Sequence, residues 1–425
     1  MRYLPAIIIL FIIGCSPAKR LSRELRTSPQ FEDHFTGFAL YDPQSGQTLM
    51  AHNADKGFVP ASNTKLFSLY AGLLTLPDSL PALRYVVRGD SLIFWGTGNP
   101  LLLNPNLPDN TALRFLSSRP ERLFYSASNY SPTRLGPGWA WDDYNEDYSC
   151  QTAPLPLYGT FVRFTFPDRV PQVSIQPPFF ADSTIVSTDR PAPREVVRDE
   201  HWNRFVRPQN LRPFRQDVPF RWSPELAARL LSDTLNRPVG LVSVPMPNNT
   251  RLLSGIPTDS LYKRTEYVSD NTLAEHILLM ASAQQGDAVL NPDRIRTLTD
   301  SVGLGRYPGI RWVDGSGMSR YNLFTPNSLI KLLIQLRVKV PQERLFSLLP
   351  STGTAGTLQG LFGTEKPYVF AKSGSMTGVY NLSGYLVTRK GRVLLFSMMH
   401  NNFAGSVSDM RQRTAKFLEQ VHNQF

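Results

Sequence analysis

Apolar and polar positions near the two ends of the chain follow the patterns of strands and helices. The segments with the spacing of strands are residues 36–41, 47–52, 379–388 and 393–400. Segments with helical spacing begin at about residue 60, after the second strand, and at about residue 406, after the last strand. The pattern therefore predicts one α/β layer that is built from the two ends of the chain.

The middle of the chain has a different pattern. Residues 85–95 have the pattern of two strands around a turn, and the following 160 or so residues are rich in proline and in short β-like segments. Helical spacing returns at residues 271–283. We therefore expect a mostly β region over residues 85–254, inserted into a domain formed by residues 31–84 and 255–425.

The first residues have the pattern of an export signal. Residues 6–13 are all apolar, but as a helix they would extend only ~12 Å, against ~30 Å for the hydrocarbon core of a bilayer. They predict a signal peptide rather than a membrane span. The sequence Ile12-Ile13-Gly14-Cys15 resembles a bacterial lipoprotein cleavage site. The resemblance implies that residues 1–14 are removed and that Cys15 is acylated.

An acylated Cys15 would anchor the exported protein to a membrane of the bacterial cell envelope, with residues 15–30 as a polar tether. An ordinary signal peptide with an incidental cysteine is the alternative. Acylation would also leave Cys150 as the only free thiol, whereas an unlipidated protein could form a Cys15–Cys150 disulfide.

Composition and charge exclude several classes of protein. The 425 residues are 41% hydrophobic and 19% charged, which is typical of globular domains. The net charge is +11, but the arginines of residues 190–221 alternate with acidic residues. Export would also separate the protein from the nucleic acids of the cell, so we expect no nucleic-acid binding. Two cysteines and six scattered histidines do not form a zinc-binding pattern, so we expect no metal.

Three short motifs carry the candidate chemistry. They are Ser62-Asn63-Thr64-Lys65, Ser269-Asp270-Asn271 and Lys372-Ser373-Gly374. Each motif alone is weak, because a serine can cap a helix and a lysine can be a surface charge. Together they form the ordered set Ser-x-x-Lys, Ser-x-Asn and Lys-Thr/Ser-Gly of penicillin-binding proteins and related lactamases.

The spacing of these residues fits nucleophilic catalysis. Positions i and i+3 of a helix share a face, so Lys65 can reach the hydroxyl of Ser62. A serine hydroxyl needs a base, and the lysine must be neutral to act as one, which burial or a second cation such as Lys372 would favour. Ser269 can relay a proton to the leaving amine, and the amide of Asn271 can hold Lys65 or a substrate carbonyl.

Two further features of the third motif concern substrate binding. We expect Gly374 to let the strand backbone approach the substrate closely. The backbone N–H groups of Ser62 and Ser375 are the candidates for an oxyanion hole.

With four further blocks, the motifs resemble the type C low-molecular-mass penicillin-binding proteins, which are D-alanyl-D-alanine carboxypeptidase/endopeptidases. The blocks are Gly98–Pro100, Gly136–Asp143 followed by Tyr148-Ser149, Asp314–Asn322, and Leu349-Pro350 followed by Gly356–Leu358. Asp314–Asn322 is the most specific of the four, and we expect Asp314 to hold this glycine-rich loop. The resemblance implies a serine transpeptidase/beta-lactamase-like α+β domain, with an antiparallel sheet flanked by helices and a large insertion.

The resemblance also implies the reaction and its partners. Ser62 would attack the penultimate D-alanine of a peptidoglycan stem peptide, and beta-lactams would acylate the same serine. Lys372, Ser373 and Ser375 would hold the substrate carboxylate, and no cofactor is needed. Serine at position 373 replaces the usual threonine but keeps the hydroxyl.

Three questions stay open on the sequence alone. Trp141 and Tyr148 would either line the substrate groove or form a packed aromatic corner. The preference between carboxypeptidase and endopeptidase activity is undecided. The alternative functions are a beta-lactamase and an inactive wall-binding lipoprotein on the same scaffold.

Overall fold

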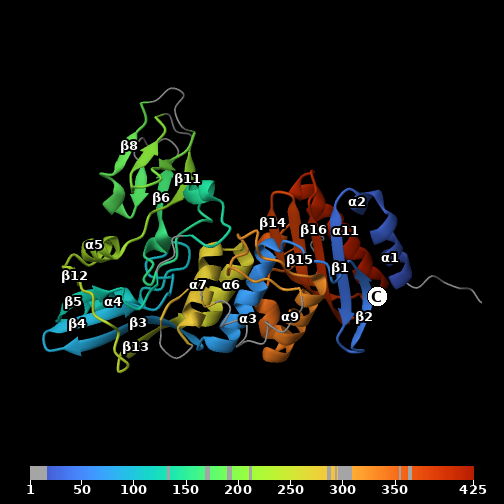
Figure 1. Cartoon of the computed structure of the whole chain (residues 1–425), viewed down its shortest axis with the longest axis horizontal. Helices are drawn as coiled ribbons and strands as arrows, with labels where there is room; N and C mark the ends of the chain where they lie inside the picture. Colours follow the sequence, from blue (N-terminus) through green and yellow to red (C-terminus); the bar gives the residue numbers. More distant parts are fainter. Residues whose placement is uncertain are drawn as a thin grey trace, which may run out of the picture.

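The computed structural model describes most of the chain (Figure 1). The described residues are 17–131, 135–167, 173–188, 194–209, 213–284, 289–291, 294, 309–353, 356–361 and 366–425. The predicted signal peptide and Cys15 lie outside these ranges, so both stay predictions. None of the helices in the described ranges is long and apolar enough to cross a membrane.

One antiparallel sheet joins the two ends of the chain, as predicted. Its strands are β1 (Phe35–Asp42), β2 (Gln47–His52), β14 (Val369–Met376), β15 (Val379–Val387) and β16 (Val393–Asn401). Their order is β14-β15-β16-β1-β2, so the N-terminal hairpin pairs with the last strand. This arrangement confirms the predicted strands and leaves β14, which carries the third motif, at an edge of the sheet.

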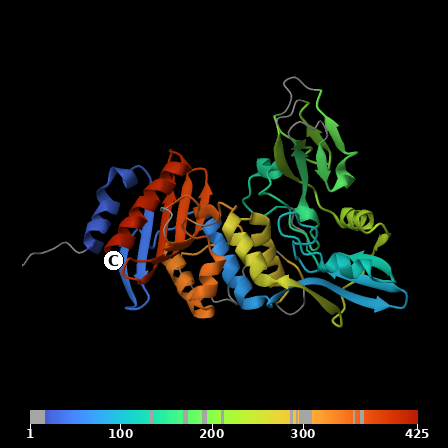
Figure 2. The ribbon, with the colours of Figure 1, turned by 180° about the vertical axis from the view of Figure 1, so that it is seen from behind.

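Helices cover both faces of this sheet because its side chains alternate between two apolar cores. Phe38 faces a core with α1 (Pro17–Thr27) and α11 (Val407–Gln424), which lie side by side in Figure 2. Ala39 faces the opposite core, with α3 (Lys65–Thr75) and α9 (Pro326–Lys339).

The predicted tether is wrong for residues 17–30. These residues form α1 and the start of α2 (Pro29–Glu32), and Leu21 and Leu25 are buried against the sheet. The two leucines are four positions apart and share one helix face. Because the rest of this segment is polar, its composition concealed the amphipathic helix.

Two helices of the main domain, α6 (Thr258–Val268) and α7 (Asn271–Ser282), stand between the sheet and the inserted region (Figure 1). The main domain also contains the 3-10 turn η1 (Ala61–Thr64), α10 (Gln342–Leu348) and the 3-10 turn η6 (Gly356–Leu358). The predicted helices beginning near residue 60 and at residue 271 are therefore confirmed. The first two motifs lie at the N-terminal ends of α3 and α7.

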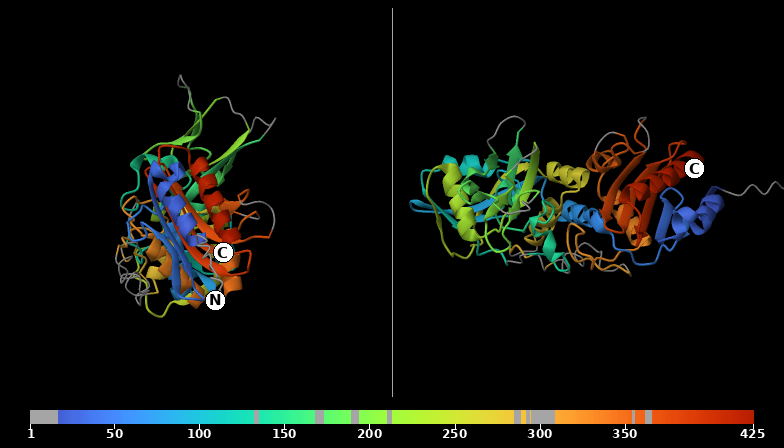
Figure 3. Two further views of the ribbon diagram at one scale, coloured as in Figure 1. Left: turned by 90° about the vertical axis from the view of Figure 1, so that its right-hand side faces the viewer. Right: turned by 90° about the horizontal axis from the view of Figure 1, so that it is seen from above.

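The inserted region has its own core and lies at the opposite end of the molecule from the sheet (Figure 3). Within its described residues, the α-helices are α4 (Thr111–Ser117) and α5 (Pro224–Leu235). Its larger sheet has the order β12-β5-β4-β3-β13, from β3 (Ser79–Arg88), β4 (Ser91–Gly96), β5 (Arg122–Ser126), β12 (Val239–Leu241) and β13 (Arg251–Pro257).

Two three-stranded sheets complete the inserted region. One has the order β11-β6-β7, from β6 (Phe161–Phe166), β7 (Ser174–Gln176) and β11 (Phe214–Pro219). The other has the order β8-β10-β9, from β8 (Thr184–Val186), β9 (Val197–Arg198) and β10 (Phe205–Arg207). The mostly β character is as predicted. The boundaries are wrong by a few residues, because β3 begins at Ser79 rather than at residue 85 and β13 ends at Pro257 rather than at residue 254.

Candidate active site

Ser62 lies in the short 3-10 turn η1, directly before α3. The preceding residue, Ala61, has a φ of 46°, which is unusual for a residue with a side chain. A Cβ atom on Gly317 would lie 1.9 Å from the carbonyl oxygen of Ala61, so only glycine allows that loop to pack here. The turn is thus held tightly, with the partly exposed Ser62 facing a groove.

Lys65 begins α3 and reaches back to Ser62, as its spacing predicts. Its side chain is completely buried. The ammonium donates three hydrogen bonds, to Ser62 Oγ (2.9 Å), Asn271 Oδ1 (2.6 Å) and the carbonyl oxygen of Ser316 (2.7 Å). Burial lowers the pKa of Lys65 to about 8, although nearby carboxyls such as Glu266 act in the opposite direction. A neutral Lys65 is therefore accessible close to neutral pH.

Ser269 and Lys372 form a second serine–lysine pair, and Ser269 lines the same groove as Ser62. Ser269 ends α6 in the left-handed conformation, with a φ of 60°. Lys372 Nζ donates to Ser269 Oγ (2.9 Å) and to the carbonyl oxygen of Ser373 (2.7 Å). Burial lowers the pKa of Lys372, and the positive charge of Lys65 lowers it further. The two ammonium groups thus disfavour each other's protonation.

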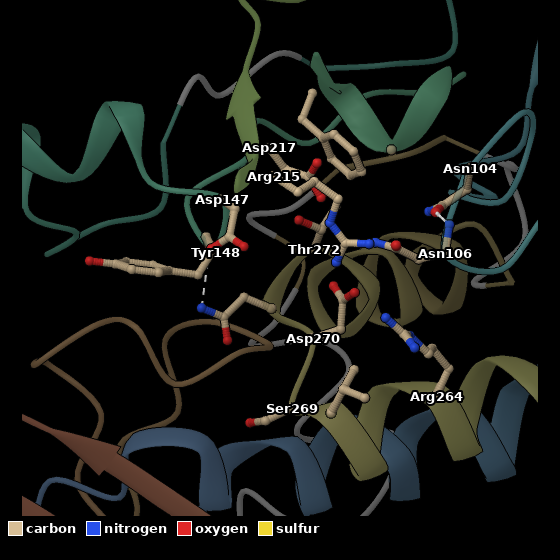
Figure 4. A pocket seen from close by; sticks show the side chains of 14 residues that line it. Asn104, Asn106, Asp147, Tyr148, Arg215, Asp217, Arg264, Ser269, Asp270 and Thr272 are labelled. Atoms are coloured by element: carbon tan, nitrogen blue, oxygen red, sulfur yellow. Dashed lines mark hydrogen bonds between the residues drawn. The ribbon is translucent and has the colours of Figure 1, made fainter. Parts of the chain in front are cut away.

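Asn271 links Lys65 to the inserted region. Its Oδ1 accepts from Lys65, and its Nδ2 donates to the carbonyl oxygen of Tyr148 (3.1 Å), drawn as a dashed line in Figure 4. The neighbouring Asp270 caps α7 by accepting from the N–H of Leu273. The Ser-x-Asn motif therefore belongs to both the lysine site and the contact with the insertion.

Strand β14 passes close to the turn that carries Ser62. A Cβ atom on Gly374 would lie 2.6 Å from the carbonyl oxygen of Pro60 and 2.8 Å from the nitrogens of Ser62 and Asn63. Gly374 therefore allows the strand to pack against this turn, whereas we had expected it to allow an approach to the substrate. Ser375 is exposed beside the groove, and Ser373 Oγ donates to Thr357 Oγ1 (2.8 Å).

The groove beside Ser62 has a volume of about 690 Å³. Ser269, Asn271, Ser375 and Tyr148 also line it, so four of the predicted site residues meet around Ser62. Trp141, in contrast to these four residues, lies outside the groove. Its side chain is 73% exposed and does not line the groove, although its neighbours Ala140 and Asp142 do. The turn directs Trp141 to solvent instead.

The glycine-rich loop after residue 313 is held by Asp314, as expected. The carboxylate accepts hydrogen bonds from Gly317 N (2.9 Å), Ser319 N (2.6 Å), Asn322 Nδ2 (2.7 Å) and Trp139 Nε1 (2.9 Å). Trp139 therefore ties the loop to the insertion. The loop in turn places the carbonyl oxygen of Ser316 against Lys65.

Sequence reasoning missed Glu266, which lies one helical turn before Ser269. Only 1% of its surface is exposed, and neither carboxyl oxygen has a hydrogen-bond partner among the described residues. Burial raises the pKa of Glu266, while the charges of Lys372 and Lys65 lower it. The signal available in the sequence was a glutamate in a helical segment beside apolar residues such as Leu261 and Tyr262.

A smaller polar cavity of about 250 Å³ lies on the other side of Ser269 and Asn271. In Figure 4, Arg215 of the inserted region extends toward Asp270 of the main domain, whereas Asp217 forms an ion pair with Arg163. Across the described ranges, no three His, Cys, Asp or Glu side chains are grouped as a metal site would require. Cys150 is buried as a free thiol.

Comparison with known proteins gives one family and several relatives. A sequence model of the D-Ala-D-Ala carboxypeptidase 3 (S13) family matches residues 18–169 and 224–421. D-alanyl-D-alanine carboxypeptidase DacB of Haemophilus influenzae is 24% identical over 427 residues, covering 89% of this chain and 88% of the relative. The D-alanyl-D-alanine carboxypeptidase of an Actinomadura species is 27% identical over 467 residues, covering 93% of this chain and 85% of the relative.

A solved structure has the same fold. The crystal structure of penicillin binding protein 4 from Haemophilus influenzae superimposes with a TM-score of 0.75 at 20% identity. The superposition covers 95% of this chain and 99% of that chain. The family match omits residues 170–223, all of which lie in the inserted region.

Proposed function

The chain belongs to the D-Ala-D-Ala carboxypeptidase 3 (S13) family and is a serine-type D-Ala-D-Ala carboxypeptidase, and on this premise we propose that Ser62 is its nucleophile. One observation carries the assignment: the buried ammonium of Lys65 lies 2.9 Å from Ser62 Oγ, beside an open groove. The substrate is a peptidoglycan stem peptide that ends in two D-alanines.

In the acylation step, neutral Lys65 takes the proton of Ser62 as Oγ attacks the carbonyl carbon of the penultimate D-alanine. The lowered pKa of Lys65, about 8, supports this role. The N–H groups of Ser62 and Ser375 stabilise the developing oxyanion, and one such donor contributes about 3–4 kcal/mol. Both residues border the groove, which supports this pairing.

The C–N bond then breaks, and the leaving amine needs a proton. Ser269 relays to it the proton that Lys65 took from Ser62, because the hydroxyl of Ser269 is held by Lys372 and opens onto the same groove as Ser62. D-Alanine departs, and water hydrolyses the acyl-serine ester to regenerate Ser62. Lys372, Ser373 and Ser375 hold the terminal carboxylate of the substrate during these steps. The hydroxyl of Ser373 keeps the hydrogen-bonding capacity of the threonine usual at this position.

Beta-lactams act as covalent inhibitors by acylating Ser62 in place of the stem peptide. The test compares labelling by a fluorescent penicillin in the wild type and in Ser62→Ala, with circular dichroism to check that both are folded. We expect labelling of the wild type alone and release of D-alanine from a synthetic pentapeptide stem. Equal labelling of both proteins would refute the assignment of Ser62, and rapid turnover of the penicillin would favour the beta-lactamase alternative.

We propose further that the enzyme is an exported lipoprotein of the bacterial cell envelope, anchored through Cys15. The support is the sequence Ile12-Ile13-Gly14-Cys15 after an apolar run. Because α1 begins at Pro17, the lipid would hold the folded domain close to the membrane. Cys15→Ser should move the protein from the membrane fraction to the soluble fraction and abolish labelling by a radioactive fatty acid. Unchanged fractionation and labelling would exclude this anchor.

A further inference from the structure

A second cavity lies next to the active-site groove, at strand β14. Its volume is about 470 Å³, and it lies between η6, strands β14 and β15 and the first turns of α11. Ser375 lines both this cavity and the groove that contains Ser62. A ligand that extends past the predicted carboxylate site would therefore enter this space.

Arg411 gives the cavity a positive charge. One guanidinium nitrogen donates to the carbonyl oxygen of Thr357 (2.8 Å), and Thr357 Oγ1 accepts from Ser373 Oγ (2.8 Å). Arg411 is thus connected through one residue to the proposed carboxylate-binding strand. No acidic side chain is among the described residues around the cavity, and none in the described ranges forms an ion pair with Arg411.

Tyr380 supplies a buried hydroxyl at the same place. It is 1% exposed, and its hydroxyl interacts with the guanidinium of Arg411. Burial raises the pKa of Tyr380 to about 12, against the effect of the nearby Arg411. A guanidinium beside several hydroxyls, with no carboxylate partner among the described residues, is suited to bind a carboxylate from a ligand.

The size of the cavity decides which ligand fits. The carboxylate of a single leaving D-alanine is already held by Ser373 and Ser375 in the proposed function. A space of about 470 Å³ lies within the range of sites for ligands much larger than one alanine. In a cross-linked substrate, the leaving amine belongs to a neighbouring stem peptide, which extends beyond the reacting bond and carries carboxylates of its own.

We propose that this cavity is the subsite for the leaving stem peptide of a cross-link, and that Arg411 binds a carboxylate of that stem. The inference rests on the proposed function of Ser62. The reaction is the same acyl transfer: the Ser62 Oγ–carbon bond forms, the carbon–nitrogen bond of the cross-link breaks, and the proton of Ser62 is passed on to the leaving amine. Water then releases the first stem from Ser62, so the net reaction is hydrolysis of the cross-link.

The experiment measures two reactions of each purified variant, with separated muropeptides as substrates. One is release of D-alanine from a monomeric pentapeptide, and the other is splitting of a D,D-cross-linked dimer. The variants are Arg411→Ala and Arg411→Lys, with Arg413→Ala as the control on the same helix, because Arg413 instead donates to the carbonyl oxygen of Gln30. Thermal unfolding of each variant tests its folding.

We expect Arg411→Ala to lower kcat/KM for the dimer by about 10- to 100-fold, as loss of a charge-assisted hydrogen bond would. D-Alanine release should change by less than about twofold. Arg411→Lys should recover part of the dimer activity, because it keeps the charge and loses the planar fork. Arg413→Ala should alter neither reaction.

Three results would overturn the inference: equal losses on both substrates, no loss on either, or a wild type that releases D-alanine but does not split dimers. None of these results would contradict the assignment of Ser62 as the nucleophile. That assignment fails separately, if fluorescent penicillin labels Ser62→Ala as strongly as the wild type.

Discussion

The strongest test of the lysine chemistry is the replacement of Glu266 by glutamine. Glu266 is buried and has no hydrogen-bond partner in the part of the chain that the structure describes, and its charge acts on both Lys65 and Lys372. Glutamine keeps the size of the side chain and removes the charge. Because an adjacent carboxylate stabilises a protonated lysine, its removal lowers the pKa of both lysines.

The magnitude follows from Coulomb's law. Two opposite charges about 6 Å apart interact by about 3 kcal/mol at an effective dielectric constant of ~20, which corresponds to roughly 2 pKa units. Burial raises the pKa of Glu266 itself, so a fraction of it is already neutral near neutral pH. We therefore expect the observed shift to be on the order of one pH unit.

The direction of the shift can be worked out for each limb of the pH profile. Acylation rises with pH as Lys65 loses its proton, and Glu266→Gln moves this limb to lower pH. Binding of the substrate carboxylate is lost as Lys372 becomes neutral, and the substitution moves that limb to lower pH as well. Because both pKa values fall, the pH profile of acylation as a whole should shift to lower pH.

The assay is the second-order rate constant for acylation by a fluorescent penicillin, measured from pH 5.5 to pH 10. Glu419→Gln is the matched control, because it removes the same charge from an exposed position on α11. An unchanged profile, or a shift to higher pH, would refute the proposed coupling. A uniform loss of rate without a shift would mean that Glu266 acts through packing alone.

Three further predictions follow from the same contacts. Lys65→Ala should slow acylation of the enzyme by about 10²–10⁴-fold, as loss of a positioned base would. Substitution of the exposed Lys56 by alanine should leave the rate unchanged. A near-normal rate for Lys65→Ala would point to another base. Gly374→Ala should abolish penicillin labelling, because its Cβ would lie 2.6 Å from a backbone oxygen of the neighbouring 3-10 turn, whereas Gly405→Ala has open space around it and should label normally. Asp314→Ala leaves four hydrogen-bond donors without their acceptor. It should lower the free energy of unfolding by about 3 kcal/mol or more, as measured by chemical denaturation. An unchanged denaturation midpoint would mean that the loop does not depend on this carboxylate.

Local patterns predicted much of the fold. The alternation of β1, β2, β15 and β16 and the helical spacing after Pro60 depend on neighbouring residues only, and the structure confirms these elements. The prediction for residues 17–30 was wrong because α1 gains its stability from burying two leucines against a distant sheet. Composition carries no information about such a contact.

The same distinction between local sequence and tertiary packing applies to the active site. The pairing of Ser62 with Lys65 follows from a three-residue spacing within one turn of chain, so the sequence by itself determined it. The close approach of Gly374 to that turn, the exposure of Trp141 and the position of Glu266 beside two lysines are different. They depend on how segments hundreds of residues apart pack together, and only the tertiary structure decided them.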